Sequence, residues 1–238
     1  MNHVDNRQNG FTLIELMLAM AFVATLLLAI AMIIVQIGGI YNKGITFTDV
    51  NRAGSSIASE LQRSINESTP FNIKSGIGSL YIQTDWGGRL CTNKYSYIWN
   101  YGKALQVPAN PNRNAYSDGS DTQIRFVKAL DPTNSYCTPA TAGKIDKSNA
   151  IELLDSGQHD LVIHSFKISS DASAADGSTG QQLYSVSFTI GTNDPTALNT
   201  NVSTGEVTCK LPGDINSNPL YCSVSQFILT ARAGNATE

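Results

Sequence analysis

The feature that most constrains this chain is a carboxylate inside a long apolar segment near the amino terminus. Glu15 is the only charged residue between Phe11 and Val35, and the rest of that stretch is almost wholly apolar. A bilayer core needs about 20 apolar residues, so the stretch is long enough to cross a membrane as a helix. A charge at the centre of a bilayer costs about 2.5–3.5 kcal/mol on insertion scales, which a plain anchor has no reason to bear. We therefore expect Glu15 to have a function.

The segment around Glu15 resembles the processing and methylation site of type IV prepilins and pseudopilins. The resemblance rests on Gly10, the following Phe11-Thr12-Leu13-Ile14-Glu15-Leu16 and the apolar stretch after it. It implies that a membrane-embedded aspartyl peptidase, the prepilin peptidase, cleaves between Gly10 and Phe11 and methylates the new amino terminus of Phe11. It also implies that Glu15, fifth after the cut, pairs with the terminal amine of a neighbouring subunit.

The residues that flank the apolar stretch indicate its orientation only in part. In the leader, residues 1–10, Arg7 is opposed by Asp5, but the positive-inside signal counts Lys and Arg and largely ignores acids. Arg7 thus favours a cytoplasmic start, whereas Lys43 and Arg52 favour the opposite. The resemblance implies a single-pass precursor in the cytoplasmic membrane with its head outside, and a cell-surface or periplasmic filament after assembly. The apolar stretch is too long for a secretory signal peptide and no small-residue cleavage site follows it.

Glycines and a proline divide the rest of the chain. Gly38, Gly39 and Gly44 each weaken a helix by about 1 kcal/mol relative to alanine, so we expect a bend or flexible joint where the chain leaves the membrane. Pro70 marks the end of the helical part. The predicted organisation is a leader at 1–10, a transmembrane or filament-core helix at 11–38, an amphipathic continuation at 39–69 and a globular β-rich head at 70–238.

The stretch after these glycines has the pattern of an amphipathic helix. Thr48 or Asp49 can cap its start. Apolar residues then recur at helical spacing, and polar residues, Glu60 and Arg63 among them, occupy the other faces. The apolar stripe has to be buried, and its predicted partner is a sheet formed by the rest of the chain. The stripe consists of Val50, Ala53, Ile57, Leu61 and Ile65.

After Pro70, short alternating segments bounded by turn residues predict an antiparallel sheet. The fold class is therefore α+β, with a long N-terminal helix packed on a β-rich head. Segments 161–168 and 183–190 are the clearest strands; we expect 169–180 to be a flexible hairpin tip and 193–218 to be irregular. The other predicted strands are 79–84, broken by Trp86-Gly87-Gly88, and 95–101, 123–127 and 223–232; 107–120 is predicted to be a loop.

The four cysteines indicate disulfides. None is part of a CxxC pair, which argues against a zinc or redox motif, and all lie outside the apolar stretch, as suits an oxidising compartment. Four cysteines allow three pairings. We favour Cys91–Cys137 and Cys209–Cys222, because each closes a modest loop between predicted strands. The other pairings and free buried thiols remain alternatives.

The sequence has no pattern typical of a catalytic, cofactor or metal site. P-loop, GxGxxG and GxSxG motifs are absent, so we expect no enzyme and no cofactor. His159 and His164 are interpreted as a turn and a strand histidine rather than metal ligands. The acidic loops at 118–121 and at Asp171 with Asp176 lack the EF-hand spacing for calcium and are interpreted as solvated turns.

Charge and aromatic content bear on the partners. The net charge is −3 and no basic run occurs, so no nucleic-acid partner is predicted. One cluster of aromatic residues is interpreted as core or cross-strand pairs, with an adhesive surface patch as the alternative. These residues are Trp86, Tyr95, Tyr97, Trp99 and Tyr101.

With the resemblance, these features predict a structural subunit, a minor one, of a type IV pilus or related filament. Segments 60–65 and 226–232 are loosely similar to the larger minor pilins and the J-type minor pseudopilin. The alternatives are a pseudopilin of a type II secretion or competence pseudopilus, and an adhesive or DNA-binding tip pilin. The implied partners are other pilin or pseudopilin subunits, prepilin peptidase, the inner-membrane assembly platform and, before assembly, the lipid bilayer.

Overall fold

A computed structural model of the chain describes most of its residues. They are 11–74, 78–107, 112–119, 122–138, 144–154, 159–176, 181–201 and 205–234. Gly10 and the rest of the leader lie outside the described residues, as do Ser120 and Asp121 of one acidic loop, and the side chains of the other, Asp171 and Asp176, also fall outside the description.

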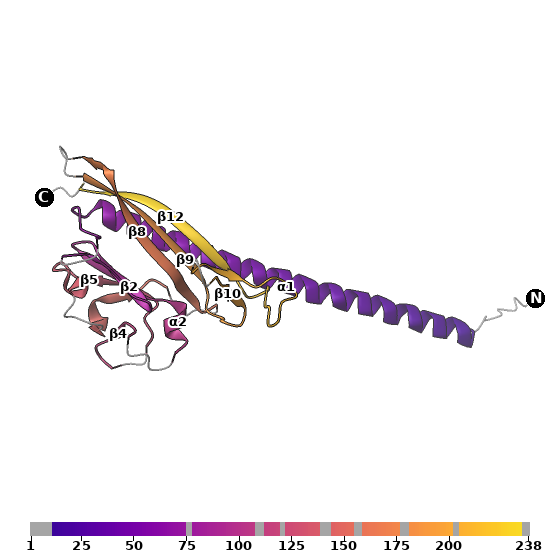
Figure 1. The fold of residues 1–238 in the computed structure, drawn as a ribbon. Helices are drawn as coiled ribbons and strands as arrows, with labels where there is room; N and C mark the ends of the chain where they lie inside the picture. The colour runs from indigo at the N-terminus through magenta and orange to yellow at the C-terminus, as the bar shows by residue number, and fades with distance from the viewer. Residues whose placement is uncertain are drawn as a thin grey trace, which may run out of the picture. The chain divides into compact units, whose positions relative to one another are not determined.

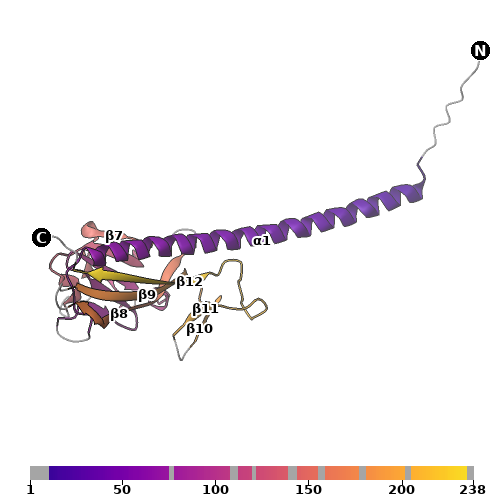
Figure 2. The same ribbon diagram turned by 90° about the horizontal axis from the view of Figure 1, so that it is seen from above.

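The structure divides into two compact units, the first ending at Asn42 and the second starting at Lys43. One long helix, α1 (Leu13–Asn66), has residues in both units (Figures 1 and 2). The helix is continuous through Gly38, Gly39 and Gly44, so no new helix begins near Thr48 or Asp49, while a bend or flexible joint at these glycines stays a prediction. Glycine lowers the stability of a helix but still donates and accepts its backbone hydrogen bonds. Three glycines spread over two turns therefore leave the helical ladder intact.

The predicted start of the amphipathic segment is wrong, whereas its predicted end is confirmed. Thr48 and Asp49 lie inside α1 and cap nothing, because the helix is already formed before them. The end agrees with the sequence: α1 stops at Asn66, four residues before Pro70.

The second unit adds the following short helices and strands to the end of α1. The helices are α2 (Gly102–Leu105), η1 (Ser135–Cys137) and η2 (Lys147–Asn149). The strands are β1 (Tyr81–Gln83), β2 (Gly87–Cys91), β3 (Tyr95–Asn100), β4 (Ala115–Tyr116), β5 (Phe126–Leu130), β6 (Lys144–Ile145), β7 (Ala150–Glu152), β8 (Leu161–Asp176), β9 (Gln181–Thr192), β10 (Leu198–Thr200), β11 (Val207–Cys209) and β12 (Val224–Ala233).

Two antiparallel sheets form the body of this unit. One has the order β1-β2-β3-β5-β7 and the other the order β12-β9-β8. A parallel bridge between Tyr101 and Ile163 joins the end of β3 to β8. Two small pairs complete the unit, β10 with β11 antiparallel and β4 with β6 parallel. The antiparallel α+β class is thus confirmed.

The core lies between the end of α1 and the two sheets. Val50, Ile57, Leu61 and Ile65 of the predicted stripe are all buried, and Ala53 packs against them. An aromatic stack runs through the sheets, with the rings of Trp99 and Phe166 only 4.2 Å apart at their centroids. The stack continues through Tyr97, Phe126, Phe188 and Phe227.

Several strand boundaries differ from the prediction. Part of the hairpin tip expected at 169–180 is strand, because β8 pairs with β9 as far as Asp171 and again at Asp176, with a register shift between the two. The region 193–218 contains the short β10–β11 pair. The strand expected at 123–127 begins only at Phe126, since the backbone N–H groups of Arg125 and Phe126 donate to the side chain of Glu152 instead.

Glycine explains one further difference. The strand predicted at 79–84 ends at Gln83, before the Trp86-Gly87-Gly88 triplet that was expected to break it, but the two glycines then begin the new strand β2. A Cβ atom on Gly88 would lie 2.4 Å from Cζ2 of Trp99 on the neighbouring strand. The residue is therefore a site of close approach inside the sheet.

Both disulfides are those that the sequence favours, Cys91–Cys137 and Cys209–Cys222. The first joins β2 to η1, and the buried carboxylate of Asp131 holds that turn. It accepts hydrogen bonds from the hydroxyl of Ser96 at 2.7 Å and from the backbone N–H of Tyr136 at 3.0 Å. Burial acts to raise the pKa of Asp131, but these donors outweigh it and the pKa lies below its ordinary value. The carboxylate is thus charged and fixes the segment that carries Cys137.

Removing either disulfide is expected to destabilise the head. The residues joined are 46 apart in the first bridge and 13 apart in the second. Chain entropy then predicts losses of about 4 and about 3 kcal/mol in the free energy of unfolding. Paired Cys→Ala variants compared with the wild type in urea titrations of the full chain in detergent measure this. Unchanged midpoints for both variants would contradict the assignment.

Candidate processing and assembly site

The described chain begins with a capping box at the start of α1. The backbone N–H and the hydroxyl of Thr12 both donate to Oε2 of Glu15, each at 2.9 Å, and the N–H of Glu15 donates back to the Thr12 hydroxyl at 3.3 Å. This is the reciprocal pattern by which a Thr at the cap and a Glu three residues later satisfy the open donors of a helix start. Glu15 therefore has a local partner within its own chain.

The capping contacts leave part of the Glu15 carboxylate available. Both donors from Thr12 go to Oε2, and no contact of Oε1 occurs within the described chain. Phe11, the last residue before the cap, is 85% exposed. Gly10, the other predicted processing residue, lies outside the described residues, so its position relative to Phe11 is not part of this geometry.

The first half of α1 presents apolar side chains without protein cover. In the described chain, α1 is the one helix long and apolar enough to cross a membrane, with a mean hydropathy of 2.9 over its most apolar window. Large side chains around the whole helix are exposed, from Leu13 at 77% to Val35 at 75% and Ile40 at 73%. A helix that is apolar on every face needs an apolar environment.

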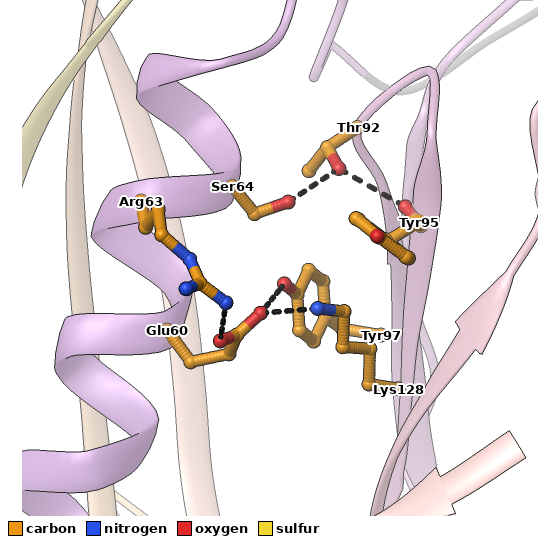
Figure 3. Close-up of polar contacts among 7 residues, drawn as sticks. All are labelled: Glu60, Arg63, Ser64, Thr92, Tyr95, Tyr97 and Lys128. Atoms are coloured by element: carbon orange, nitrogen blue, oxygen red, sulfur yellow. Dashed lines mark hydrogen bonds and ion pairs between the residues drawn. The ribbon is translucent and has the colours of Figure 1, made fainter.

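At its other end, α1 is held to the five-stranded sheet by Glu60 (Figure 3). We call the contacts of Glu60 with Tyr97 and Lys128 the Glu60 latch. Oε1 of Glu60 accepts hydrogen bonds from Nζ of Lys128 at 2.5 Å and from the hydroxyl of Tyr97 at 3.1 Å. Oε2 of Glu60 accepts a hydrogen bond at 2.7 Å from the guanidinium group of Arg63, which lies one turn later in the helix. The ammonium group of Lys128 also lies 3.7 Å from the ring centroid of Tyr95. A parallel link joins Ser64 to Thr92 through their hydroxyls at 2.9 Å.

The Glu60 latch is a largely buried ion pair. The side chains of Glu60 and Lys128 are 18% and 14% exposed. Burial acts to raise the pKa of the Glu60 carboxyl, but donation from Lys128 and Tyr97 and the nearby positive charges outweigh it, and the pKa lies below its ordinary value. Burial raises the pKa of the Tyr97 hydroxyl, which stays protonated and able to donate. Glu60 is therefore charged at neutral pH and fully partnered.

The opposite flank of α1 is joined to β12. The amide of Gln62 donates to the carbonyl of Thr230 at 3.1 Å, and the N–H of Arg232 donates to the side chain of Asn66 at 3.0 Å. Gly54 permits this approach, since a Cβ atom there would lie 2.1 Å from the ring of Phe227. The helix end is thus fixed on both flanks.

Sequence reasoning missed the Glu60 latch. It placed Glu60 and Arg63 together on the polar faces of the helix, yet Arg63 is 64% exposed while Glu60 is mostly buried. The available signal was the position of Glu60 directly beside Leu61 of the apolar stripe, which puts it at the border of the buried face. Its partner Lys128 lies in a strand far along the chain, and no spacing rule connects the two.

The remaining candidates take structural positions. Nδ1 of His159 lies 2.8 Å from Asp49, and Nε2 of His164 lies 3.2 Å from the carbonyl of Thr192. Burial lowers the pKa of His164 to about 4, although its hydrogen bond acts in the other direction. Within the described stretches, no three His, Cys, Asp or Glu side chains converge as a metal site.

The aromatic cluster is core rather than a surface patch. Tyr97 and Trp99 are fully buried and Tyr101 is 7% exposed, so the alternative of an adhesive patch built on these side chains is wrong. The physical reason is cross-strand stacking: adjacent strands bring the rings together on the buried face. Trp86 and Tyr95 are partly buried at its edge.

The comparison with protein families gives one match at the amino terminus. Residues 5–35 match the family described as the prokaryotic N-terminal methylation motif, and this range contains Gly10, Phe11 and Glu15. No curated protein and no solved structure matches the chain. The family match covers the start of α1 and does not extend into the head. Residues 5–35 therefore carry a prokaryotic N-terminal methylation motif, which supports the resemblance of this segment to type IV prepilins and pseudopilins.

Proposed function

We propose that the chain is a minor structural subunit of a type IV pilus or related filament, cleaved between Gly10 and Phe11 and methylated at Phe11 before assembly. The observation that carries this proposal is the methylation motif at residues 5–35, continued by a helix whose apolar side chains have no protein cover within the described chain. Lipid covers them in the precursor, and the helices of other subunits cover them in the filament.

In this proposal, Glu15 has a role in both states. Before assembly its Oε2 caps α1 through Thr12, which satisfies part of the carboxylate inside the membrane. Cleavage then creates an amine at Phe11, and Oε1 of a neighbouring Glu15 is available to accept it. The pair forms in a dry bundle of helices, where an unpaired charge is costly, so it favours the assembled state.

The carboxy-terminal end of α1 is held to the head on both flanks. The Glu60 latch on one flank and the Gln62–Thr230 contact on the other tie the end of α1 to both sheets. A subunit drawn into a filament by its helix thus brings the head with it. The proposed partners are other pilin or pseudopilin subunits, prepilin peptidase and an inner-membrane assembly platform.

Changing Gly10 tests the processing step. The peptidase has to accommodate the residue directly before the cut, so we expect Gly10→Ala to slow cleavage and Gly10→Leu to abolish it. Intact-mass spectrometry of wild-type protein from sheared filaments should give a chain beginning at a methylated Phe11. Asn9→Leu, which leaves the residue before the cut unchanged, is the control and should still be processed. Filaments that contain Met1-initiated wild-type chains would contradict the proposal.

A further inference from the structure

A groove of about 870 Å³ lies in the head, and no residue of α1 lines it. Three parts of the unit line it: α2 with the end of β3, the face of β8, β9 and β12 opposite the core, and the β10–β11 pair. Its volume falls within the range of about 300–1,000 Å³ that is usual for ligand sites. Such sites are mostly apolar, and the lining here combines apolar surface with many side chains that carry amides, hydroxyls or ammonium groups. The groove therefore suits a ligand that combines many hydrogen-bonding groups with apolar faces, as a sugar ring does.

Three glutamines in the groove are held in place by the protein, and each keeps hydrogen-bonding capacity. Nε2 of Gln106 donates to Asn193 at 2.9 Å, and Nε2 of Gln226 donates to Ser187 at 3.0 Å. Within the described residues, the amide oxygens of both have no partner. Gln83 donates to the hydroxyl of Tyr101 at 3.3 Å through one of its two N–H groups. The groove thus offers oriented acceptors and a donor, the combination that a row of sugar hydroxyls can satisfy.

Two lysines give the groove a positive character. Lys103 is on α2 and Lys167 is on β8, and both line it. Neither forms an ion pair with a carboxylate in the described part of the chain. Lys103 instead lies over the ring of Trp86, with its Nζ 5.8 Å from the centroid. Two ammonium groups without carboxylate partners favour a ligand that bears isolated negative charges.

We propose that this groove binds an oligosaccharide that bears carboxylates, such as a uronate-containing glycan. The amides recognise ring hydroxyls, and Lys103 and Lys167 recognise carboxylates on separate sugars. A nucleic acid fits less well, because it carries a phosphate at every residue and requires clustered cations. The groove also contains the carboxylate of Glu206, and the net charge of the chain is −3. This site is independent of filament assembly.

Calorimetric titration of the full-length chain in detergent micelles tests the proposal. The probes are a short oligogalacturonate, the same oligosaccharide with its carboxylates methyl-esterified, and a single-stranded DNA oligonucleotide. We expect the oligogalacturonate to bind, and esterification to weaken binding about fivefold to tenfold, as loss of two exposed ion pairs predicts. Lys103→Gln with Lys167→Gln should weaken oligogalacturonate binding by a similar factor.

Two further variants make the result specific to the groove. Gln106→Leu should weaken binding of the esterified and the free oligosaccharide alike, because it removes a contact to hydroxyls. Lys144→Gln changes the charge of an exposed lysine outside the groove and should leave binding as in the wild type. Absence of oligogalacturonate binding, equal binding by the double lysine variant, or tighter binding of the DNA would each overturn the proposal.

Discussion

Replacing Glu15 by valine is expected to leave the precursor inserted and cleaved but to reduce its amount in filaments at least about tenfold. Valine is favoured in a bilayer, so insertion does not suffer. In the assembled bundle, however, the amine of a neighbouring Phe11 loses its partner, and an unpaired buried charge costs several kcal/mol. The measurement is the ratio of the protein in sheared filaments to that in the membrane fraction.

The capping box supplies the matched control for Glu15. Thr12→Ala removes the donors to Oε2 of Glu15 but keeps the carboxylate, so it costs only the capping energy of about 1 kcal/mol. We expect Thr12→Ala to assemble nearly as well as the wild type, and Glu15→Asp to assemble in part because its reach is shorter. Equal incorporation of Glu15→Val and wild type would show that the carboxylate has no role in assembly.

Breaking the Glu60 latch is expected to destabilise the head by an amount comparable to the loss of a disulfide. Removing one partner of a buried ion pair leaves the other charge without compensation, which costs about 3–5 kcal/mol. Because Glu60 and Lys128 keep some exposure, we expect about 2–4 kcal/mol for Glu60→Gln or Lys128→Met. The double variant should cost less than the sum of the single ones. Urea titration of all four proteins gives the coupling energy.

Arg63 is the matched control for the Glu60 latch. It binds the same carboxylate, but its side chain is 64% exposed, so Arg63→Gln should cost less than about 1 kcal/mol. The pH dependence provides a second check. Since the folded pKa of Glu60 lies below the ordinary 4.5, its contribution is complete above that pH and is lost as the pH falls through the folded value. In Glu60→Gln, the free energy of unfolding should therefore fall less steeply as the pH is lowered below 4.5 than in the wild type. The same acid unfolding curve for both proteins would contradict the assignment of Glu60 as a charged, buried partner of Lys128.

Local patterns in the sequence predicted the elements whose formation depends on nearby residues. The apolar stripe from Val50 to Ile65 is buried as its spacing requires, and both cysteine pairs close between the expected segments. The Glu15 motif could be recognised because a charge in an apolar stretch is costly and therefore rare.

Features that depend on contacts between distant parts of the chain could not be predicted. The continuity of α1 through Gly44 reflects cooperative helix formation, which the penalty of a single glycine underestimates. The continuation of β8 from Ser169 to Asp171 depends on its pairing with β9, which lies outside this segment. The groove around Lys103 and Lys167 likewise joins three segments that are separate in sequence.

The arrangement of the disulfides has a consequence for how the head matures. Each bridge joins cysteines that follow one another along the chain, Cys91 with Cys137 and then Cys209 with Cys222. A head that crosses the membrane from its amino-terminal end presents them to an oxidant in that order. An enzyme that simply oxidises each newly exposed pair would then produce the native linkage, and no reshuffling by an isomerase is needed. Oxidative maturation of this head should therefore depend on a thiol oxidase and proceed normally in cells that lack a disulfide isomerase.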